Sequence, residues 1–570
     1  MTDLLDAVLR SADAQGDRAA LTHGRRTLSY RELGEGIRAV AAGLRADGLR
    51  DGDRVLFSVR PGADAVVLAL GIVHAGGVVV FADPGAGEQL FRARTALAAP
   101  RYVAAESLLY LASSRPLRGL ARRRGLELPP YGTLVPDARH LYTGPRLPGV
   151  PRRAVPLRTL LTPTSLPTSH PHPTPGSHPT SRPTRGESTH SGSSWASPPA
   201  ETRTLTGDGG PTPASAGGGQ GEALVIFTSG TTDAPKAVVH SRESLGAGLG
   251  DFAEAVGMRP GLRVLTDQLM VGVPALIAGA HWTIPPAGVD PGARPEQYLG
   301  LLPGAELLFA SPAALDAILR ALDADPALVP SRLETIVLGG APVLRPLLAR
   351  TVERFPGARI RAVYGMTEIL PVAIADGVAK LAEPAGEGDP AGVLVPSVDA
   401  RIEDGELVLS GPGLALGYLG QAPLTELRTG DLARLDHDGA GTRLTLLGRR
   451  KEMFIRGTQN VYPGLYEPII AGLDGVADVA MAGMPDEIGD DRIVLAVVPA
   501  DEPPATATPD HPLLPRVRAA LPGLIDAGVL PDVVVAVPEL PRSGRSRKLD
   551  RAALAASLAA FARMGDVRRG

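Results

Sequence analysis

Cysteine is absent from all 570 residues of this sequence. That absence excludes a disulfide framework and a cysteine nucleophile. A chain without disulfides suits a reducing compartment, so we expect a cytoplasmic protein. Net charge is also nearly absent, because 58 lysines and arginines stand against 61 aspartates and glutamates, which leaves -3. This balance provides no broad basic surface and argues against a nucleic-acid partner.

Long uninterrupted apolar runs are scarce as well. The most hydrophobic window, residues 63–82, contains Asp64 and His74 and is broken by three glycines. A helix followed by a buried strand at residues 78–81 fits this pattern better than a membrane span. Residues 1–6 lack a basic segment followed by an apolar core, so we also expect no signal peptide.

What the sequence does contain is an alternation of helix and strand patterns. Ser29 and Glu32 have the spacing of a capping box, and apolar residues then recur at helical intervals from Leu33 to Leu44. Such alternation predicts a layered α/β body, and the length allows two or more domains. Continuous apolar runs predict buried strands at residues 54–59, 78–81, 223–226, 307–310, 335–338, 493–498 and 533–537.

The composition changes between residues 150 and 221, where proline, serine, threonine and glycine dominate. Too little apolar surface is available there to offset the entropy of ordering the chain, so we predict a disordered insertion. Its four histidines could be interpreted as metal ligands. A solvated linker is the better interpretation, because neither cysteine nor a regular scaffold accompanies them.

The segment from Phe227 to Lys236 is the most informative one, because it follows a buried-strand pattern with hydroxyl residues, a glycine and a lysine. Gly230 lets the backbone turn closely around an anion, and the hydroxyls and Lys236 can meet phosphate oxygens. The order of residues is not that of a Walker A loop. A serine- and threonine-rich surface turn is the alternative that this segment alone leaves open.

Further segments follow in a recognisable order: Tyr364–Glu368, Arg428–Leu432, Gly448–Glu452 and Leu540–Arg551. Together with residues 227–236 they resemble the adenylate-forming (AMP-binding) superfamily, which includes acyl-CoA synthetases, peptide-synthetase adenylation domains and luciferases. The resemblance runs from about residue 21 to about residue 554, apart from the low-complexity tract. It implies a large N-terminal α/β domain, residues 1–448, and a small mobile α+β domain, residues 449–570.

The resemblance also implies a nucleotide site in the large domain. Glu368 is the expected Mg²⁺ ligand, Thr367 the residue beside the α-phosphate, and Tyr364 with Gly365 the adenine contact. Asp431 is expected to accept the ribose hydroxyls, with Arg449 reaching ribose or phosphate. The β- and γ-phosphates are expected at Thr228, Ser229, Gly230, Thr231, Thr232 and Lys236, and the adenine-side loop at Gly339, Gly340, Ala341 and Pro342.

Three residues of the smaller domain are assigned by the same resemblance. Lys548 is the expected catalytic cation, bridging the substrate carboxylate and the α-phosphate as a charge rather than as a base. Lys451 occupies the hinge about which relatives rotate this domain between two half-reactions. Gly457 corresponds to the lining of a channel for the thiol arm of coenzyme A. For Lys548 the alternative is a solvated basic tail, and for the other two an ordinary linker and turn.

Several positions depart from the family pattern. Asp233 and Ala237 stand where glycines are usual, and Asp233 would place negative charge beside pyrophosphate. Arg547 replaces the glycine before the catalytic lysine, and Leu465 replaces an acidic residue. The segment Leu265–Leu269 lacks the usual histidine or aromatic residue near the acyl site.

The expected activity is therefore ATP-dependent activation of a small-molecule carboxylic acid, followed by thioester formation with coenzyme A. The expected cofactors are ATP, Mg²⁺ and coenzyme A. One alternative is transfer of the adenylate to an acyl carrier protein or to an internal hydroxyl, giving a β-lactone. Another is a degenerate nucleotide-binding module without catalysis, which Asp233 would favour. The identity of the acid is not encoded in any of these motifs.

Overall fold

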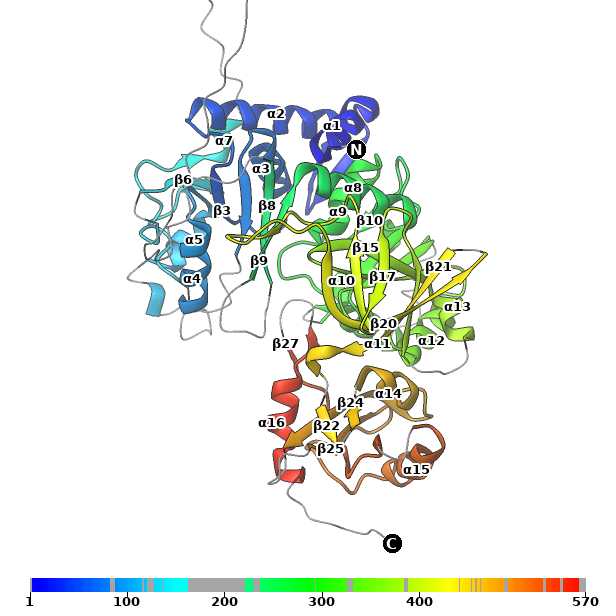
Figure 1. Cartoon of the computed structure of the whole chain (residues 1–570). Coiled ribbons are helices and arrows are strands. Elements are labelled where there is room, and N and C mark those ends of the chain that lie inside the picture. Colours follow the sequence, from blue (N-terminus) through cyan, green and yellow to red (C-terminus); the bar gives the residue numbers. More distant parts are fainter. Residues whose placement is uncertain are drawn as a thin grey trace, which may run out of the picture. The chain divides into compact units, whose positions relative to one another are not determined.

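The computed structural model describes residues 3–82, 88–114, 117–119, 128–135, 137–161, 221–228, 236–292, 294–324, 332–383, 388–439, 441–452, 454–456, 459–461, 463–485, 491–525, 529–543 and 547–562. Two large sheets carry most of the described strands, and helices pack against them (Figure 1). The expected α/β fold is confirmed. No helix in these ranges is both long and apolar enough to cross a bilayer.

The larger sheet changes from parallel to antiparallel at one strand, β14. On one side of β14 the strands β13, β12, β10, β11 and β1 run parallel, and on the other side the pairs are antiparallel. In spatial order the strands are β17 (Asp399–Glu403), β18 (Glu406–Ser410), β20 (Leu427–Asp438), β21 (Gly441–Arg449), β16 (Asp389–Leu394), β15 (Ile369–Asp376), β14 (Arg359–Met366), β13 (Thr335–Gly339), β12 (Leu307–Ala310), β10 (Arg263–Leu265), β11 (His281–Ile284), β1 (Ala19–His23) and β2 (Arg26–Ser29).

The second large sheet is parallel except at β9, which pairs antiparallel with β8 and β19. Its spatial order is β19 (Gly417–Tyr418), β9 (Lys236–Ser241), β8 (Glu222–Thr228), β4 (Val78–Phe81), β3 (Arg54–Ser58), β5 (Tyr102–Glu106), β6 (Arg139–Thr143) and β7 (Val155–Pro156). Segments far apart in sequence, β8–β9 and β19, therefore share one edge.

The helices of the large region are α1 (Leu4–Gln15), α2 (Tyr30–Ala46), α3 (Ala63–His74), α4 (Glu88–Ala98), α5 (Ser107–Ala112), α7 (Leu157–Leu160), α8 (Arg242–Ala255), α9 (Leu269–Ile277), α10 (Pro295–Leu299), α11 (Pro312–Ala324), α12 (Arg345–Arg354) and α13 (Gly377–Ala382). The capping box of α2 is confirmed: the Ser29 and Glu32 side chains each accept a backbone N–H of the other. The hydrophobic window at residues 63–82 forms α3 and β4, as expected.

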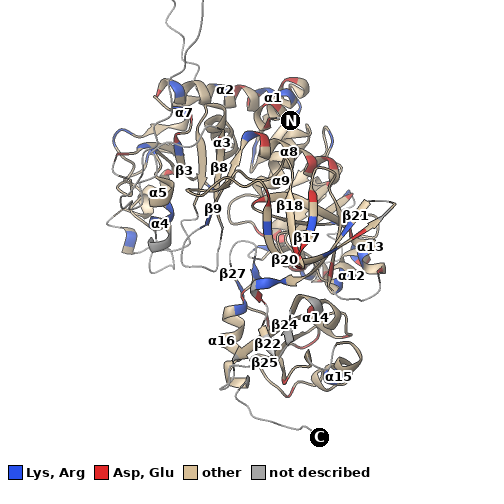
Figure 2. Cartoon of the chain, in the orientation of Figure 1, with Lys and Arg blue, Asp and Glu red and all other residues tan. Residues whose placement is uncertain are grey.

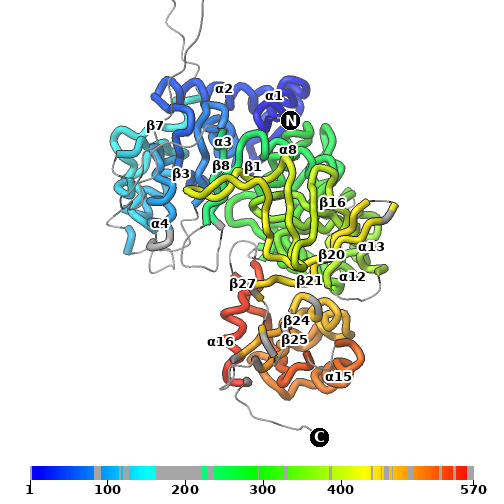
Figure 3. The backbone as a smooth tube through the Cα atoms, viewed as in Figure 1, coloured from blue at the N-terminus to red at the C-terminus, as the bar shows by residue number. Residues whose placement is uncertain are grey.

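The chain after residue 453 folds around its own short sheet (Figure 3). That sheet consists of β24 (Val476–Pro485), β25 (Asp491–Pro499) and β26 (Val533–Ala536), with α14 (Pro463–Ile470), α15 (Leu514–Ala520) and α16 (Arg551–Ala562). Two hairpins, β22 (Phe454–Arg456) with β23 (Gln459–Val461) and β27 (Arg542–Ser543) with β28 (Lys548–Leu549), complete the region. The domain boundary near residue 449 stays a prediction.

The low-complexity tract begins later than predicted. Residues 150–161 were assigned to it, but β7 pairs with β6, and Leu157 and Leu160 are buried in the main core. These two leucines provide apolar surface that can be buried, and the composition of the residues that follow offers little of it. Residues 150–161 are therefore ordered. Residues 162–220 lie outside the described ranges.

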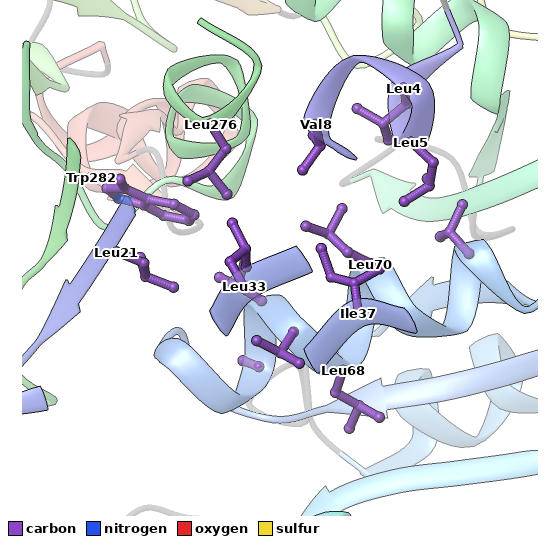
Figure 4. Packing of buried hydrophobic residues seen from close by; sticks show 14 of the residues in the cluster. Leu4, Leu5, Val8, Leu21, Leu33, Ile37, Leu68, Leu70, Leu276 and Trp282 are labelled. Atoms are coloured by element: carbon purple, nitrogen blue, oxygen red, sulfur yellow. The ribbon is translucent and has the colours of Figure 1, made fainter. Parts of the chain in front are cut away.

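The largest core lies where α1, α2, α3 and α9 meet β1 and β11 (Figure 4). Trp282 of β11 is fully buried beside Leu21 and Leu276, and its indole N–H donates to the Thr266 carbonyl at 2.8 Å. Helix α9 can approach this ring because it has a glycine at position 272. A Cβ on Gly272 would lie 2.0 Å from the indole.

Gly272→Ala should therefore destabilise the fold, by about 1–3 kcal/mol, because a fully buried ring has no space to retreat. Chemical denaturation of the full chain measures this change. Gly250→Ala in α8 is the matched control, since a Cβ there meets nothing within 4 Å. Helix propensity predicts that the control gains up to about 1 kcal/mol. Equal effects of the two substitutions would contradict the packing argument.

Candidate active site

The tight turn Thr367–Glu368 follows β14, the strand at which the sheet changes direction. Ligands of open α/β sheets bind outside the carboxyl ends of the strands, and this turn lies at that end of β14. Met366 pairs with Ile369, so Thr367 and Glu368 form the tip of a hairpin. Gly365 is needed just before it, because a Cβ at that position would lie 2.5 Å from the Leu370 side chain. The sequence motif thus delivers two polar side chains to the sheet end.

Asp431 is a buried carboxylate, only 3% exposed, and it joins three strands. The Tyr364 hydroxyl of β14 donates to Oδ2 at 2.6 Å. Arg449 of β21 stands opposite Asp431 of β20, with its Nε 2.7 Å from Oδ1. That second contact is an ion pair without hydrogen-bond geometry, and Oδ1 has no hydrogen-bond donor among the described residues.

The electrostatics of this group follow from its burial. Desolvation raises the pKa of Asp431, while Arg449 and the Tyr364 hydroxyl act in the opposite direction. Burial, followed by the charge of Asp431, raises the pKa of Tyr364 well above its ordinary value. Tyr364 therefore stays a hydrogen-bond donor at neutral pH. A buried acceptor without a donor suits a ligand that brings hydroxyl groups.

Lys236 and Glu368 both contact one aromatic residue, Tyr418. The Lys236 ammonium lies 5.3 Å from the centroid of the Tyr418 ring, and the Tyr418 hydroxyl donates to Glu368 Oε1 at 2.8 Å. The first contact is a cation–π interaction and the second a charge-assisted hydrogen bond. Tyr418 thus contacts two of the predicted site residues, the basic Lys236 and the acidic Glu368.

A buried histidine also contacts the backbone of the Thr367–Glu368 turn. His240 of β9 lies 2.7 Å from the Thr367 carbonyl through Nε2 and 3.1 Å from the Ser244 hydroxyl through Nδ1. Because a carbonyl only accepts, Nε2 carries the proton. Burial lowers the pKa of His240, against smaller raising effects of Thr367 and Glu368, which favours the neutral imidazole.

The predicted adenine-side loop lies beside the same strand. Gly339 ends β13 and pairs with Val363 of β14, and the loop Gly340–Pro342 leads toward α12. Gly340 has φ +83°, which a glycine adopts without strain. This loop and Tyr364 therefore occupy neighbouring strand ends, as expected for residues that share one ligand.

Lys548 lies on the short hairpin β27–β28, opposite Ser543. It is an exposed residue, yet desolvation, followed by the charge of Arg449, lowers its pKa, and Asp431 and Glu368 act in the raising direction. Arg547 before it has φ +46°, in the left-handed region. This backbone conformation explains why a glycine is usual at that position.

Lys451, the predicted hinge residue, lies in the 3₁₀ turn η4 (Arg450–Glu452), and its side chain is outside the described part. Glu452 of the same turn pairs with Arg551 at 2.8 Å, three residues after Lys548. Arg551 also binds Glu467 at 2.8 Å through two nitrogens.

Some predicted residues cannot be placed. Ser229, Gly230, Thr231, Thr232, Asp233 and Gly457 lie outside the described ranges, as does the side chain of Thr228. The ends of the phosphate segment are described: Thr228 of β8 stands opposite Lys236 of β9. Within the described ranges no three His, Asp or Glu side chains gather as a metal site. Glu368 alone still suits Mg²⁺, which commonly uses one or two carboxylates plus substrate phosphate.

Two residues at this site were missed by the sequence analysis, Tyr418 and His240. Tyr418 belongs to a Gly-Tyr pair that matches no catalytic pattern, and His240 stands in an apolar strand where a packed core histidine is the ordinary interpretation. Acidic and basic residues are interspersed over the surrounding strands, as the small net charge implies (Figure 2). Only the three-dimensional arrangement identifies these two among many polar residues.

The lowered pKa of His240 has a measurable consequence for stability. Above the unfolded pKa, about 6.5, both states are neutral and pH has no effect through this group. As pH falls below that value, the unfolded state binds a proton at this histidine, whereas the folded state leaves it neutral. The free energy of unfolding then falls by up to about 1.4 kcal/mol per pH unit until the folded pKa is reached.

His240→Gln retains an N–H donor for the Thr367 carbonyl but cannot titrate, so it should lose this part of the slope. Urea unfolding between pH 5 and pH 7.5, comparing variant with wild type, isolates the share of His240 from those of other buried histidines. The same exchange at exposed His437 is the control for losing an imidazole. An unchanged slope in His240→Gln would contradict the assignment.

Comparisons with known proteins agree with this geometry. The family model described as AMP-binding enzyme matches residues 8–419. An isonitrile lipopeptide synthase of Streptomyces coeruleorubidus is 32% identical over 379 residues, which cover 59% of this chain and 23% of that protein. A 2-succinylbenzoate–CoA ligase of Bacillus cereus (strain Q1) is 29% identical over 295 residues, 46% of this chain and 57% of that one. The chain thus spans less than two thirds of either relative.

Solved structures extend the likeness to the whole fold. The amide bond synthetase McbA of Marinactinospora thermotolerans superposes with a TM-score of 0.71 at 20% identity, over 97% of this chain and 99% of that one. At this identity the likeness concerns the fold alone. The family model covers well over half of the residues, and the chain therefore belongs to the AMP-binding enzyme family.

Proposed function

We propose that this protein joins a small-molecule carboxylic acid to AMP with ATP and then transfers the acyl group to the thiol of coenzyme A. The observation that carries the proposal is the buried Asp431 carboxylate: Tyr364 donates to its Oδ2, whereas Oδ1 has only the ion pair with Arg449 and no hydrogen-bond donor among the described residues. Leaving such an acceptor unsatisfied is costly. The two hydroxyls of a ribose would satisfy it, and few other ligands bring adjacent donors to one carboxylate.

The neighbouring groups fit the remaining parts of ATP. Tyr364 and the loop Gly339–Pro342 offer an aromatic face and close backbone approach for adenine. Lys236 offers positive charge to the β- and γ-phosphates, and Glu368 is the residue that would hold Mg²⁺. A bound Mg²⁺ supplies neutralisation of phosphate charge. Thr367, at the same turn, can donate its hydroxyl to the α-phosphate.

Chemistry at this site requires charge compensation rather than a proton relay. In the first step a carboxylate oxygen of the substrate bonds to the α-phosphorus, and the bond to pyrophosphate breaks. Lys548 stabilises the negative charge shared by both reactants, as a cation. In the second step the thiol sulfur attacks the acyl carbon and AMP leaves. Lys451 is the proposed hinge between the two steps, and Gly457 the proposed lining of the thiol channel.

The acceptor of the second step separates this proposal from its closest alternative. A carrier protein or an internal hydroxyl of the substrate would replace coenzyme A there, and the first step would be unchanged. Consumption of free thiol in the presence of coenzyme A, ATP and acid supports the thioester step. Adenylate formation without thiol consumption would favour the alternative acceptors.

Acid-dependent exchange of labelled pyrophosphate into ATP tests the first step directly. A panel of carboxylic acids, including aromatic ones, should contain at least one that raises exchange above the acid-free rate. Thermal stabilisation by ATP with no exchange for any acid would instead favour a nucleotide-binding module without catalysis.

Lys548→Ala should lower the exchange rate by about 100- to 1,000-fold, because a charge that acts in the transition state is removed. Arg547→Gly is the matched control, since it removes one positive charge from the same hairpin. Glycine also suits φ +46°, so this variant should keep exchange near the wild-type rate and gain about 1 kcal/mol of stability. If both variants lose exchange equally, general positive charge rather than Lys548 is responsible.

A further inference from the structure

Tyr418 occupies a fixed place at the edge of the second large sheet. Strand β19 pairs antiparallel with β9, so that Tyr418 stands opposite Val238, two residues from Lys236. Backbone hydrogen bonds extend this pairing on both sides, from Leu416 N to Val239 O and from Leu419 N to Ala237 O, each at 2.8 Å. The backbone therefore sets where the Tyr418 side chain can reach.

The same segment holds the Glu368 turn by its backbone. Ala415 N donates to the Glu368 carbonyl at 2.8 Å, and the Tyr418 hydroxyl donates to the Glu368 carboxylate at 2.8 Å. Residues 415–418 thus contact both ends of one residue. A glutamate on a two-residue turn has several rotamers open to it, and the hydrogen bond from the Tyr418 hydroxyl favours one of them.

The Tyr418 side chain uses different parts for its two charged neighbours. Its ring face lies toward the Lys236 ammonium, at 5.3 Å, and its hydroxyl lies against Glu368. Because a carboxylate only accepts, the hydroxyl must remain protonated.

A purely structural role would place Tyr418 within one of the apolar clusters. The residue is half-buried and belongs to none of them, although its neighbour Leu419 packs against one. What the side chain contacts instead are two charged groups, Lys236 on β9 and Glu368 on the turn between β14 and β15. This arrangement is the pattern by which supporting residues orient the ligands of metals and anions.

We propose that Tyr418 is a positioning residue that fixes the phosphate-binding lysine and the metal-binding carboxylate relative to each other. This inference rests on the proposed function, since it assigns Lys236 and Glu368 to ATP and Mg²⁺. The hydroxyl fixes the carboxylate, and the ring fixes the ammonium. Removing each part separately should therefore affect metal and nucleotide binding differently.

Two variants separate the two parts. Tyr418→Phe keeps the ring under Lys236 and removes the hydroxyl, whereas Tyr418→Leu removes both. Isothermal titration of the full chain measures ATP affinity in EDTA and in a series of Mg²⁺ concentrations. Tyr418→Phe should bind ATP in EDTA like wild type, but its apparent Mg²⁺ affinity in the presence of ATP should fall about 10- to 100-fold. Tyr418→Leu should also lose about two- to fivefold in ATP affinity without metal.

A double-mutant cycle with Glu368→Gln tests whether the hydroxyl acts through this carboxylate. Adding Tyr418→Phe to Glu368→Gln should change the Mg²⁺ dependence by less than twofold, because the partner of the hydroxyl has already been altered. Wild-type Mg²⁺ dependence in Tyr418→Phe would overturn the inference, and so would a full additional loss in the double variant. If Tyr418→Leu fails to fold, Tyr418→Phe decides alone. Wild-type protein that binds no ATP would instead overturn the proposed function.

Discussion

The arrangement of the large sheet around the site depends on keeping one carboxylate, Asp431, inside the protein. Removing an ion from water costs several kcal/mol unless partners offset it. The offset comes from Tyr364 on β14 and Arg449 on β21, so two segments that are distant in sequence, β14 and the β20–β21 hairpin, must converge at one point. The raised pKa of Asp431 shows that the offset is incomplete. The folded state therefore retains an electrostatic cost at the position where a ligand with hydroxyl donors would lower it.

The Thr367–Glu368 turn of the larger sheet is also held by several partners, and two of them, His240 and Tyr418, belong to the second large sheet. Its backbone carbonyls accept from His240 and from Ala415, and its carboxylate accepts from Tyr418. Because β9 carries both Lys236 and His240, one strand supplies the cation and the support of the turn. Contacts that already exist without a ligand lower the cost of ordering these side chains when one binds. Pre-arranged charges of this kind are what phosphate chemistry requires.

Sequence patterns predicted the parts of this structure that depend on local periodicity. The α2 capping box, the strands β3, β4, β12 and β13, and the α3–β4 unit are set by neighbours along the chain. The resemblance also brought Tyr364, Glu368, Lys236 and Asp431 to attention. Tyr418 could not be found in this way, because its importance arises from the pairing of β19 with β9, a register that no local pattern encodes. The predicted start of the insertion was wrong for a similar reason. Leu157 and Leu160 are buried by their contacts with α2 and β6.

The charge environment of Lys548 shows why the hairpin has to meet an anion. Desolvation and Arg449 disfavour its ammonium, and Asp431 and Glu368 only partly compensate, so its pKa falls. By linkage, a ligand that adds negative charge nearby raises this pKa and is itself bound more tightly by the protonated lysine. A phosphate or carboxylate would provide that charge. Binding of such an anion would therefore stabilise the lysine as a cation, and the lysine would accelerate a reaction only where its contact strengthens further in the transition state.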